Sequence, residues 1–209
     1  MKSVLTSIFC LFLTFLVWCW GFHIIHAINN RFQVQRHFSV FIFMAFNLFL
    51  IFRRLMEMDI PWFVWIAHGL FIVVLVLMSL IDTYTYCILN QHLLICFVIS
   101  LLHRVINPLS QNHFIFLTCV VPLLLIVLKN NKYMGFGDVI LLLICALYLN
   151  LVSFYITLVI AVMSATGCSI LLIAMRRRSM RDTIPFVPFI TFGFVMTLLF
   201  DAPIWFGFQ

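Results

Sequence analysis

Long apolar runs, broken only by short polar segments, fill almost the whole of this chain. Hydrophobic residues make up 66% of the 209 residues and charged residues only 9%, whereas a soluble globular domain averages about half apolar and a quarter charged. A water-soluble fold of this size would lack the polar surface needed to cover so much apolar material. A lipid bilayer solvates apolar side chains directly. The sequence therefore predicts an integral membrane protein, and its net charge of +6 reports orientation rather than nucleic-acid binding.

The pattern of loops predicts an all-α, polytopic bundle of about eight transmembrane helices in a single integral membrane domain, 1–209. A helix needs roughly 20 apolar residues to cross a bilayer core about 30 Å thick. The expected helices lie at about 4–28, 38–52, 61–81, 91–107, 114–128, 138–150, 153–174 and 185–206. The first of them is too long for the apolar part of a signal peptide. Helices one and two fall in 1–60, and the remaining core falls in 61–209.

The basic residues indicate how the bundle is oriented. With eight helices and both termini outside the cytoplasm, the inner loops are 29–37, 82–90, 129–137 and 175–184. They hold eight of the twelve lysines and arginines, as the positive-inside rule requires. A seven-helix alternative joins residues 139–175 into one overlong helix and moves Arg176–Arg178 to the opposite side from loop 129–137. We therefore expect eight helices, both termini extracytoplasmic, and a helix boundary near Asn150.

The cysteines and histidines do not predict a metal site or a cofactor. No two of the seven cysteines form a CxxC pair, and most lie in apolar runs, where cysteine behaves as a small hydrophobic residue. His23 and His26 lie one helical turn apart, with Cys19 one turn before them, and this spacing could hold a metal or haem. A polar stripe near the end of a membrane helix gives the same pattern. We expect neither metal nor cofactor.

Two of the six acidic residues stand apart from the others. Ionisable groups at membrane depth cost a few kcal/mol each, so they tend to be functional. Asp82 ends the apolar run of the third predicted helix, and Asp138 opens the sixth. The charge pattern places both at the cytoplasmic boundary, where carboxylates from separate helices could meet. The alternative is that each aspartate only caps its helix. The other acidic residues are Glu57, Asp59, Asp182 and Asp201, which we interpret as loop or helix-end charges.

Three sequence elements together resemble the type IV prepilin peptidase (leader peptidase) family of GxGD aspartyl membrane proteases. They are Asp82, the GFGD at 135–138 and the IPFVPF at 184–189. GxGD alone is a short motif, so the order and spacing of all three carry the resemblance, which covers roughly residues 61–198. The two glycines of the motif can loosen the backbone and let another chain approach closely.

The resemblance implies a site and a reaction. Asp82 and Asp138 would be catalytic, sharing one proton and activating water. The residues expected to position the substrate are Gly135, Phe136, Gly137, Pro185 and Pro188. The prolines would bend the start of the last helix towards the site. The substrate would be a prepilin or pseudopilin precursor with a basic leader followed by an apolar helix, cut at the cytoplasmic face of a bacterial inner membrane. The sequence leaves the oligomeric state undetermined.

The chain departs from the family pattern at several positions. Ile140 stands where a basic residue is frequent, and Val187 stands between the two prolines where glycine is frequent. A proline is common near the position of Leu89 and Asn90. Loop 29–37 has no cysteine, whereas many relatives carry zinc-binding CxxC pairs there and also methylate the new amino terminus. We therefore expect a divergent short form, with peptidase activity, no zinc and no methyltransferase activity.

Other functions remain compatible with two aspartates in a membrane. A small proton- or cation-coupled transporter or channel subunit could use them, although the chain shows no internal repeat. Presenilin-like proteases also use a GxGD aspartate, but they are larger and carry a Pro-Ala-Leu motif that is missing here. A preflagellin peptidase remains open. Tyr84, Tyr86 and Phe136 could form a wall of the site or belong to an aromatic belt at the membrane surface.

Overall fold

The computed structural model describes residues 62–106, 135–176 and 183–200, and this part of the chain is helical throughout, apart from short connections. Its helices are α3 (Trp62–Thr85), α4 (Asn90–Ile106), α6 (Phe136–Tyr148), α7 (Leu151–Ala174) and α8 (Val187–Phe200). Two helical stretches, Ile66–Thr85 in α3 and the whole of α7, are long and apolar enough to cross a membrane. The predicted all-α class is confirmed for these residues.

Several predictions concern residues outside the described ranges. They include the helices at 4–28, 38–52 and 114–128, both termini, the pair His23 and His26, and the inner loop 29–37. The total of eight helices, the orientation of the termini and the multi-pass topology therefore stay predictions.

The third predicted helix is longer than expected. The sequence predicted its end at residue 81, but α3 continues to Thr85, so Asp82 lies in the last turn of the helix rather than at its end. Tyr86 closes the helix: its φ is 54°, and its N–H donates to the carbonyl oxygen of Asp82 at 2.9 Å. This is a left-handed C-terminal cap. The Thr83 hydroxyl donates to the Ser79 carbonyl oxygen at 2.7 Å, which allows a polar residue to continue an apolar helix.

The predicted helix boundary near Asn150 is confirmed. α6 and α7 are separated by two extended residues, and Asn150 is the N-cap of α7, with its side chain accepting from the Ser153 N–H at 2.8 Å. On the other side of the boundary, the guanidinium of Arg104 donates to the carbonyl oxygens of Leu147 and Leu149. Leu147 lies in the last turn of α6 and Leu149 is its C-cap. Carbonyl oxygens at a helix C-terminus lack N–H partners within the helix, so the Arg104 side chain of α4 supplies donors for them.

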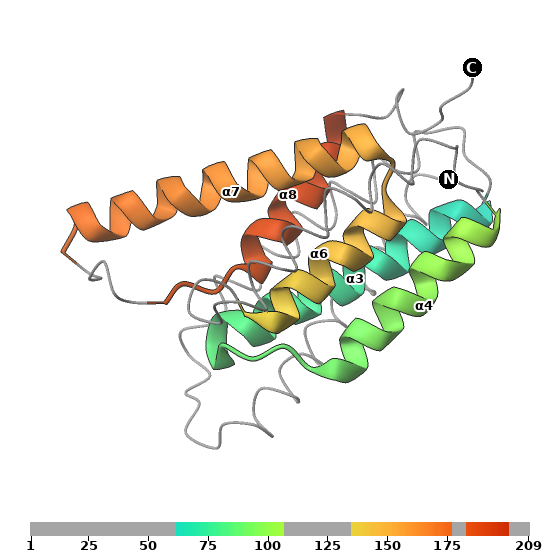
Figure 1. Ribbon diagram of the computed structural model, residues 1–209, viewed down its shortest axis with the longest axis horizontal. Coiled ribbons are helices and arrows are strands. Elements are labelled where there is room, and N and C mark those ends of the chain that lie inside the picture. Colours follow the sequence, from blue (N-terminus) through green and yellow to red (C-terminus); the bar gives the residue numbers. More distant parts are fainter. Residues whose placement is uncertain (1–61, 107–134, 177–182, 201–209) are drawn as a thin grey trace, which may run out of the picture.

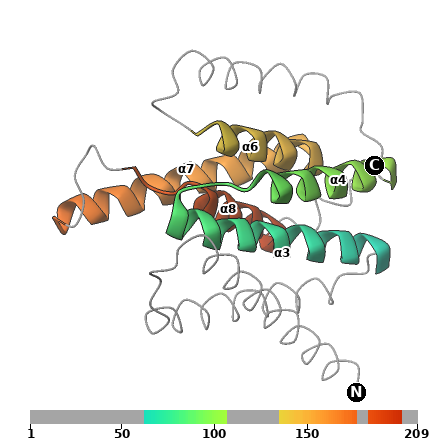
Figure 2. The same ribbon diagram turned by 90° about the horizontal axis from the view of Figure 1, so that it is seen from below.

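The helices pack side by side, with α8 between α3 and α7 and with α4 against both α3 and α6 (Figures 1 and 2). Aromatic rings mark the centre: Phe71 of α3 stacks on Tyr148 of α6 at 4.2 Å and contacts Phe194 of α8 at 5.1 Å between ring centroids. The Tyr148 hydroxyl also forms a 2.8 Å hydrogen bond with His68 Nδ1. Buried polar contacts of this kind fix the register of neighbouring helices in a membrane.

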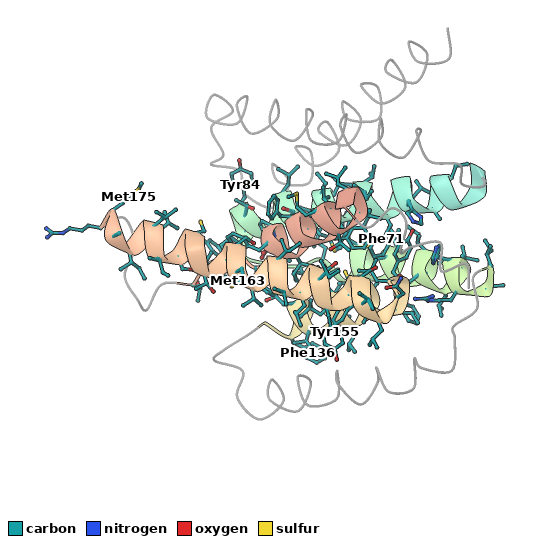
Figure 3. The ribbon with its side chains drawn as sticks, turned by 90° about the horizontal axis from the view of Figure 1, so that it is seen from above. Phe71, Tyr84, Phe136, Tyr155, Met163 and Met175 are labelled. Carbon is teal, nitrogen blue, oxygen red and sulfur yellow. The ribbon has the colours of Figure 1, made fainter. Side chains whose placement is uncertain are left out.

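The contacts also fix the directions of the helices. Phe71 and Phe194 meet near the middle of the bundle, while the Thr191 hydroxyl donates to the Leu75 carbonyl oxygen at 3.3 Å. α3 and α8 are therefore antiparallel, so the end of α3 meets the beginning of α8. The C-terminal half of α7 extends past the other helices (Figure 1), and Met163 and Met175 project outward from it (Figure 3).

Candidate active site

The two aspartates that the sequence singled out lie at the same end of the bundle. Asp82 is in the last turn of α3, and Asp138 is in the first turn of α6, which runs in the opposite direction. They are close enough for the charge of Asp82 to act on the carboxyl group of Asp138. Asp82 is only 6% exposed, and Asp138 is partly buried. The structure thus brings two acidic side chains from separate helices to the same end of the bundle, within electrostatic reach of each other, one buried and the other partly buried.

The segment 184–189 meets Asp82 through its backbone. The Val187 N–H donates to Asp82 Oδ2 at 3.2 Å, and the Phe186 N–H also interacts with this carboxyl group. α8 begins at Val187, so Pro185 lies before the helix and Pro188 is its second residue. Proline is tolerated in the first turn because its missing N–H would have no partner within the helix. The segment therefore directs the N-terminus of α8 at Asp82.

Gly135 makes room for the carboxyl group of Asp138. A Cβ atom at position 135 would lie 3.0 Å from Asp138 Oδ2. The backbone there is extended, with φ −66° and ψ 141°, and among the described residues no glycine has a positive φ. Any residue can adopt this conformation, so the observed backbone does not require glycine at position 135. Its role is spatial, since any side chain would press on the aspartate.

Gly137 allows α6 to approach the loop that follows α3. A Cβ atom at position 137 would lie 3.0 Å from Cδ1 and 3.2 Å from Cβ of Ile88, closer than real Cβ atoms normally lie. Ile88 belongs to the short α3–α4 connection, which starts at Tyr86. The second glycine of the motif therefore sets how near the beginning of α6 can come to the end of α3, and with it the separation of the two carboxyl groups.

The aromatic residues do not form one wall. Phe136, the first residue of α6, is 59% exposed, and Tyr86 is 46% exposed. Figure 3 shows Tyr84 and Phe136 projecting from opposite sides of the bundle. Phe136 lies two residues from Asp138 and stays a candidate for contact with a substrate, whereas Tyr84 does not share its surface.

Sequence reasoning missed two residues of this site. Val187 contacts Asp82 through its backbone, and Ile88 packs against Gly137. The proline at position 188 carried a usable signal for the first: proline is common in the first turn of a helix, so a helix N-terminus was to be expected there. Nothing in the sequence indicated the contact of Ile88.

The chemistry open to this arrangement is acid–base catalysis. Two neighbouring carboxyl groups hold one proton more easily than two negative charges, so one can accept a proton while the other donates one. Within the described ranges, no three His, Cys, Asp or Glu side chains gather as metal ligands.

Comparison with known proteins identifies the family. No curated protein and no solved structure matches the chain. The model of the type IV leader peptidase family matches residues 69–174, about half of the chain, including both aspartates and the GFGD segment. The match ends before the segment 184–189. The link between that segment and the family therefore rests on the sequence resemblance alone. The chain belongs to the type IV leader peptidase family.

Proposed function

We propose that the protein is a membrane aspartyl endopeptidase that removes the basic leader peptide from type IV prepilin-like precursors at the cytoplasmic membrane face. The observation that carries this proposal is the meeting of Asp82 and Asp138 at one end of the bundle. Family membership supplies the peptidase activity, and the pair of carboxyl groups supplies a mechanism for it.

In the proposed reaction the pair holds a single proton. The ionised carboxylate removes a proton from water, and the water oxygen attacks the carbonyl carbon of the scissile peptide bond. The protonated partner donates its proton to the carbonyl oxygen. As the tetrahedral intermediate collapses, the carbon–nitrogen bond breaks and the leaving amine takes up a proton from the pair. One hydroxyl of the intermediate returns a proton to the pair, which restores its single proton. The products are the leader with a free carboxylate and the shortened pilin with a free amine.

Helix lengths support a site below the membrane surface. α6 and α7 meet at one boundary, but α6 has 13 residues and α7 has 24, which correspond to about 20 Å and about 36 Å. The beginning of α6, with Asp138, therefore stops well short of the far end of α7. Irregular backbone at membrane depth is tolerated where it is buried in protein or lines a wet cavity. A recess there would let water reach the aspartates while the apolar helix of the substrate stays in lipid.

The groove between α4 and α6 does not suit a cation, so it does not favour the transporter alternative. The groove has a volume of about 400 Å³ and is lined by apolar side chains, with Asn90 as its one polar residue. Such a lining offers almost no oxygen ligands to a cation. A preflagellin peptidase would use the same two aspartates and differs only in substrate.

The test is cleavage by the purified full-length chain. Reconstituted into proteoliposomes with a prepilin precursor, it is expected to release the leader, and mass spectrometry of the product gives the cleaved bond. A preflagellin precursor is tested in parallel, and proton flux is followed in the same vesicles. Flux that depends on Asp82 and Asp138, without cleavage of either precursor, would instead establish the transporter.

Gly137→Val is expected to reduce cleavage strongly without unfolding the bundle. The new side chain meets Ile88, so the beginning of α6 moves away from the end of α3 and the carboxyl groups separate. A displacement of about 1 Å in a catalytic group can cost about a hundredfold in rate. Initial rates of prepilin cleavage measure the effect. Gly167→Val is the matched control, because a Cβ atom at position 167 on α7 meets nothing within 4 Å. Equal rates for the two variants would contradict this role of Gly137.

A further inference from the structure

Asp82 occupies a position that is unfavourable for a negative charge within its own helix. It lies in the last turn of α3, and its carbonyl oxygen accepts the capping N–H of Tyr86. The C-terminal end of a helix carries a partial negative charge, which repels a carboxylate. The charge also loses most of its contact with water, since the residue is 6% exposed. An ionised Asp82 therefore needs a compensating partner from another element.

α8 supplies that partner at its N-terminus. In the first turn, the N–H groups of Phe189 and Ile190 both donate to the Phe186 carbonyl oxygen, at 3.0 and 3.2 Å, and Pro188 has no N–H. The remaining N–H of the turn belongs to Val187, and it donates to Asp82 Oδ2 at 3.2 Å. Val187 is fully buried, so water does not compete for this N–H.

The ionisable groups around Asp82 are few. α8 has no ionisable side chain at any position, α6 contributes Asp138, and the ionisable residue of α4 nearest this end is the buried His92. The end of α3 and the connection after it add Tyr84, Tyr86 and Cys87. The electrostatic effect of Asp138 opposes a second negative charge. The backbone dipoles of α8 are thus the main favourable influence on an ionised Asp82 among the described elements.

We propose that Val187 is a positioning residue for the cleavage reaction, whose backbone N–H fixes Oδ2 of Asp82 and stabilises the negative charge of the aspartate pair. The inference rests on the proposed function of Asp82. In this proposal Val187 holds Oδ2 of Asp82. The other carboxylate oxygen of Asp82 then faces Asp138 and the attacking water. The contact of Val187 also explains chemically why the segment with two prolines lies beside the site: Pro188 has no N–H, so within the first turn of α8 Val187 supplies the N–H that donates to Asp82, next to the Phe186 N–H just before the helix.

The decisive experiment removes one hydrogen-bond donor without adding an atom. The α-hydroxy analogue of valine at position 187 replaces the N–H by an ester oxygen in the full-length protein. A matched ester at Phe192, whose side chain is 47% exposed, controls for the general effect of an ester in α8. Val187→Ala keeps the N–H and controls for the side chain. Cleavage of a prepilin precursor is measured as kcat and KM over a range of pH.

The ester at Val187 is expected to lower kcat roughly tenfold with little change in KM, as for loss of a hydrogen bond to a charged group. The acid limb of the pH profile should move to higher pH by about one unit, because the ionised pair loses a stabilising donor. Val187→Ala and the Phe192 ester should keep the wild-type acid limb. A merely structural role of Val187 would lower the amount of folded protein without moving that limb.

Two results would overturn the inference. If the Val187 ester keeps the wild-type acid limb while Asp82→Asn is inactive, Val187 does not act on the aspartate and the proposed peptidase mechanism stands. If Asp82→Asn still cleaves, the proposed function and this inference both fail. Should the ester protein not accumulate, Val187→Pro replaces it, because proline is well tolerated at the first position of a helix. Its ring displaces the Asp82 carboxylate, and the acid limb decides in the same way.

Discussion

Asp82→Asn and Asp138→Asn each abolish leader-peptide cleavage in a prepilin processing assay. The reaction needs one ionised and one protonated carboxyl group at the same time, and either change leaves only one carboxyl group. Acid–base catalysis by a positioned side chain contributes about a hundredfold to ten-thousandfold, so a residual rate below about 1% is expected for each variant. The double variant should be no worse than either single one, since residues that act as a unit are not additive.

Asparagine is the right replacement because it preserves the packing. The amide oxygen of Asn at position 82 can still accept the Val187 N–H, which Asp82 now accepts at 3.2 Å. At position 138 the side chain keeps its size beside Gly135, whose hydrogen atoms leave space for it. Both variants should therefore show thermal unfolding in detergent close to that of the wild type. Asp182→Asn, a carboxylate of a predicted loop, serves as the activity control and should cleave normally.

The rate of the wild-type protein is expected to follow a bell-shaped curve with pH. Cleavage needs one proton on the pair: with two protons there is no base, and with none there is no acid. Either asparagine variant with substantial cleavage, or a wild-type rate that rises without a second limb, would rule out the shared-proton mechanism.

The gross fold was predictable because a bilayer leaves few choices. Every backbone polar group must be satisfied within the segment, so apolar runs of this length become helices. The boundary at Asn150 followed from helix length and charge, and the side chain of Asn150 caps α7 as an asparagine should. The pairing of Asp82 with Asp138 could be anticipated because both aspartates interrupt apolar sequence at the same predicted membrane face.

The finer structure of the site was not predictable, for two physical reasons. Thr83 and Thr85 looked like the start of a loop, but their hydroxyls bond to carbonyl oxygens one turn back and keep α3 helical past Asp82. The contact of Val187 with Asp82 is made by the backbone, and the identity of a side chain does not report which backbone N–H is left without a partner. The glycines at 135 and 137 were noticed for their flexibility, but the close contacts that a Cβ atom would make with Asp138 and Ile88 could not be read from the sequence.

Among glycine-to-alanine substitutions at the glycines that the structure describes, Gly193→Ala is expected to lower the stability most. Gly193 lies where α8 crosses α7, and a Cβ atom there would be 2.4 Å from the Thr157 carbonyl oxygen and 3.1 Å from the Ala161 N. Both obstacles are backbone atoms, which no rotamer change can move aside. The helices must separate instead, and that strains the 2.9 Å hydrogen bond between the Thr157 and Thr197 hydroxyls.

Close approach through small residues is the usual way for membrane helices to pack, since lipid supplies no hydrophobic drive for their association. Overpacking typically costs about 1–3 kcal/mol, and a backbone obstacle places Gly193→Ala at or above the upper end of that range. The thermal unfolding temperature in detergent should fall clearly. Because α8 carries the Val187 N–H to Asp82, cleavage should fall as well.

Gly167→Ala is the matched control on the partner helix, because a Cβ atom there meets nothing within 4 Å. Alanine is favoured over glycine in a helix interior by roughly 0.5–1 kcal/mol, so this variant should unfold at the wild-type temperature or slightly above it. The two substitutions add the same methyl group to apolar helices that pack against each other, and only the distance to the neighbouring backbone differs. An unfolding temperature for Gly193→Ala equal to that of Gly167→Ala would show that α7 and α8 do not cross closely at Gly193, and α8 would then lose the support that holds its N-terminus against Asp82.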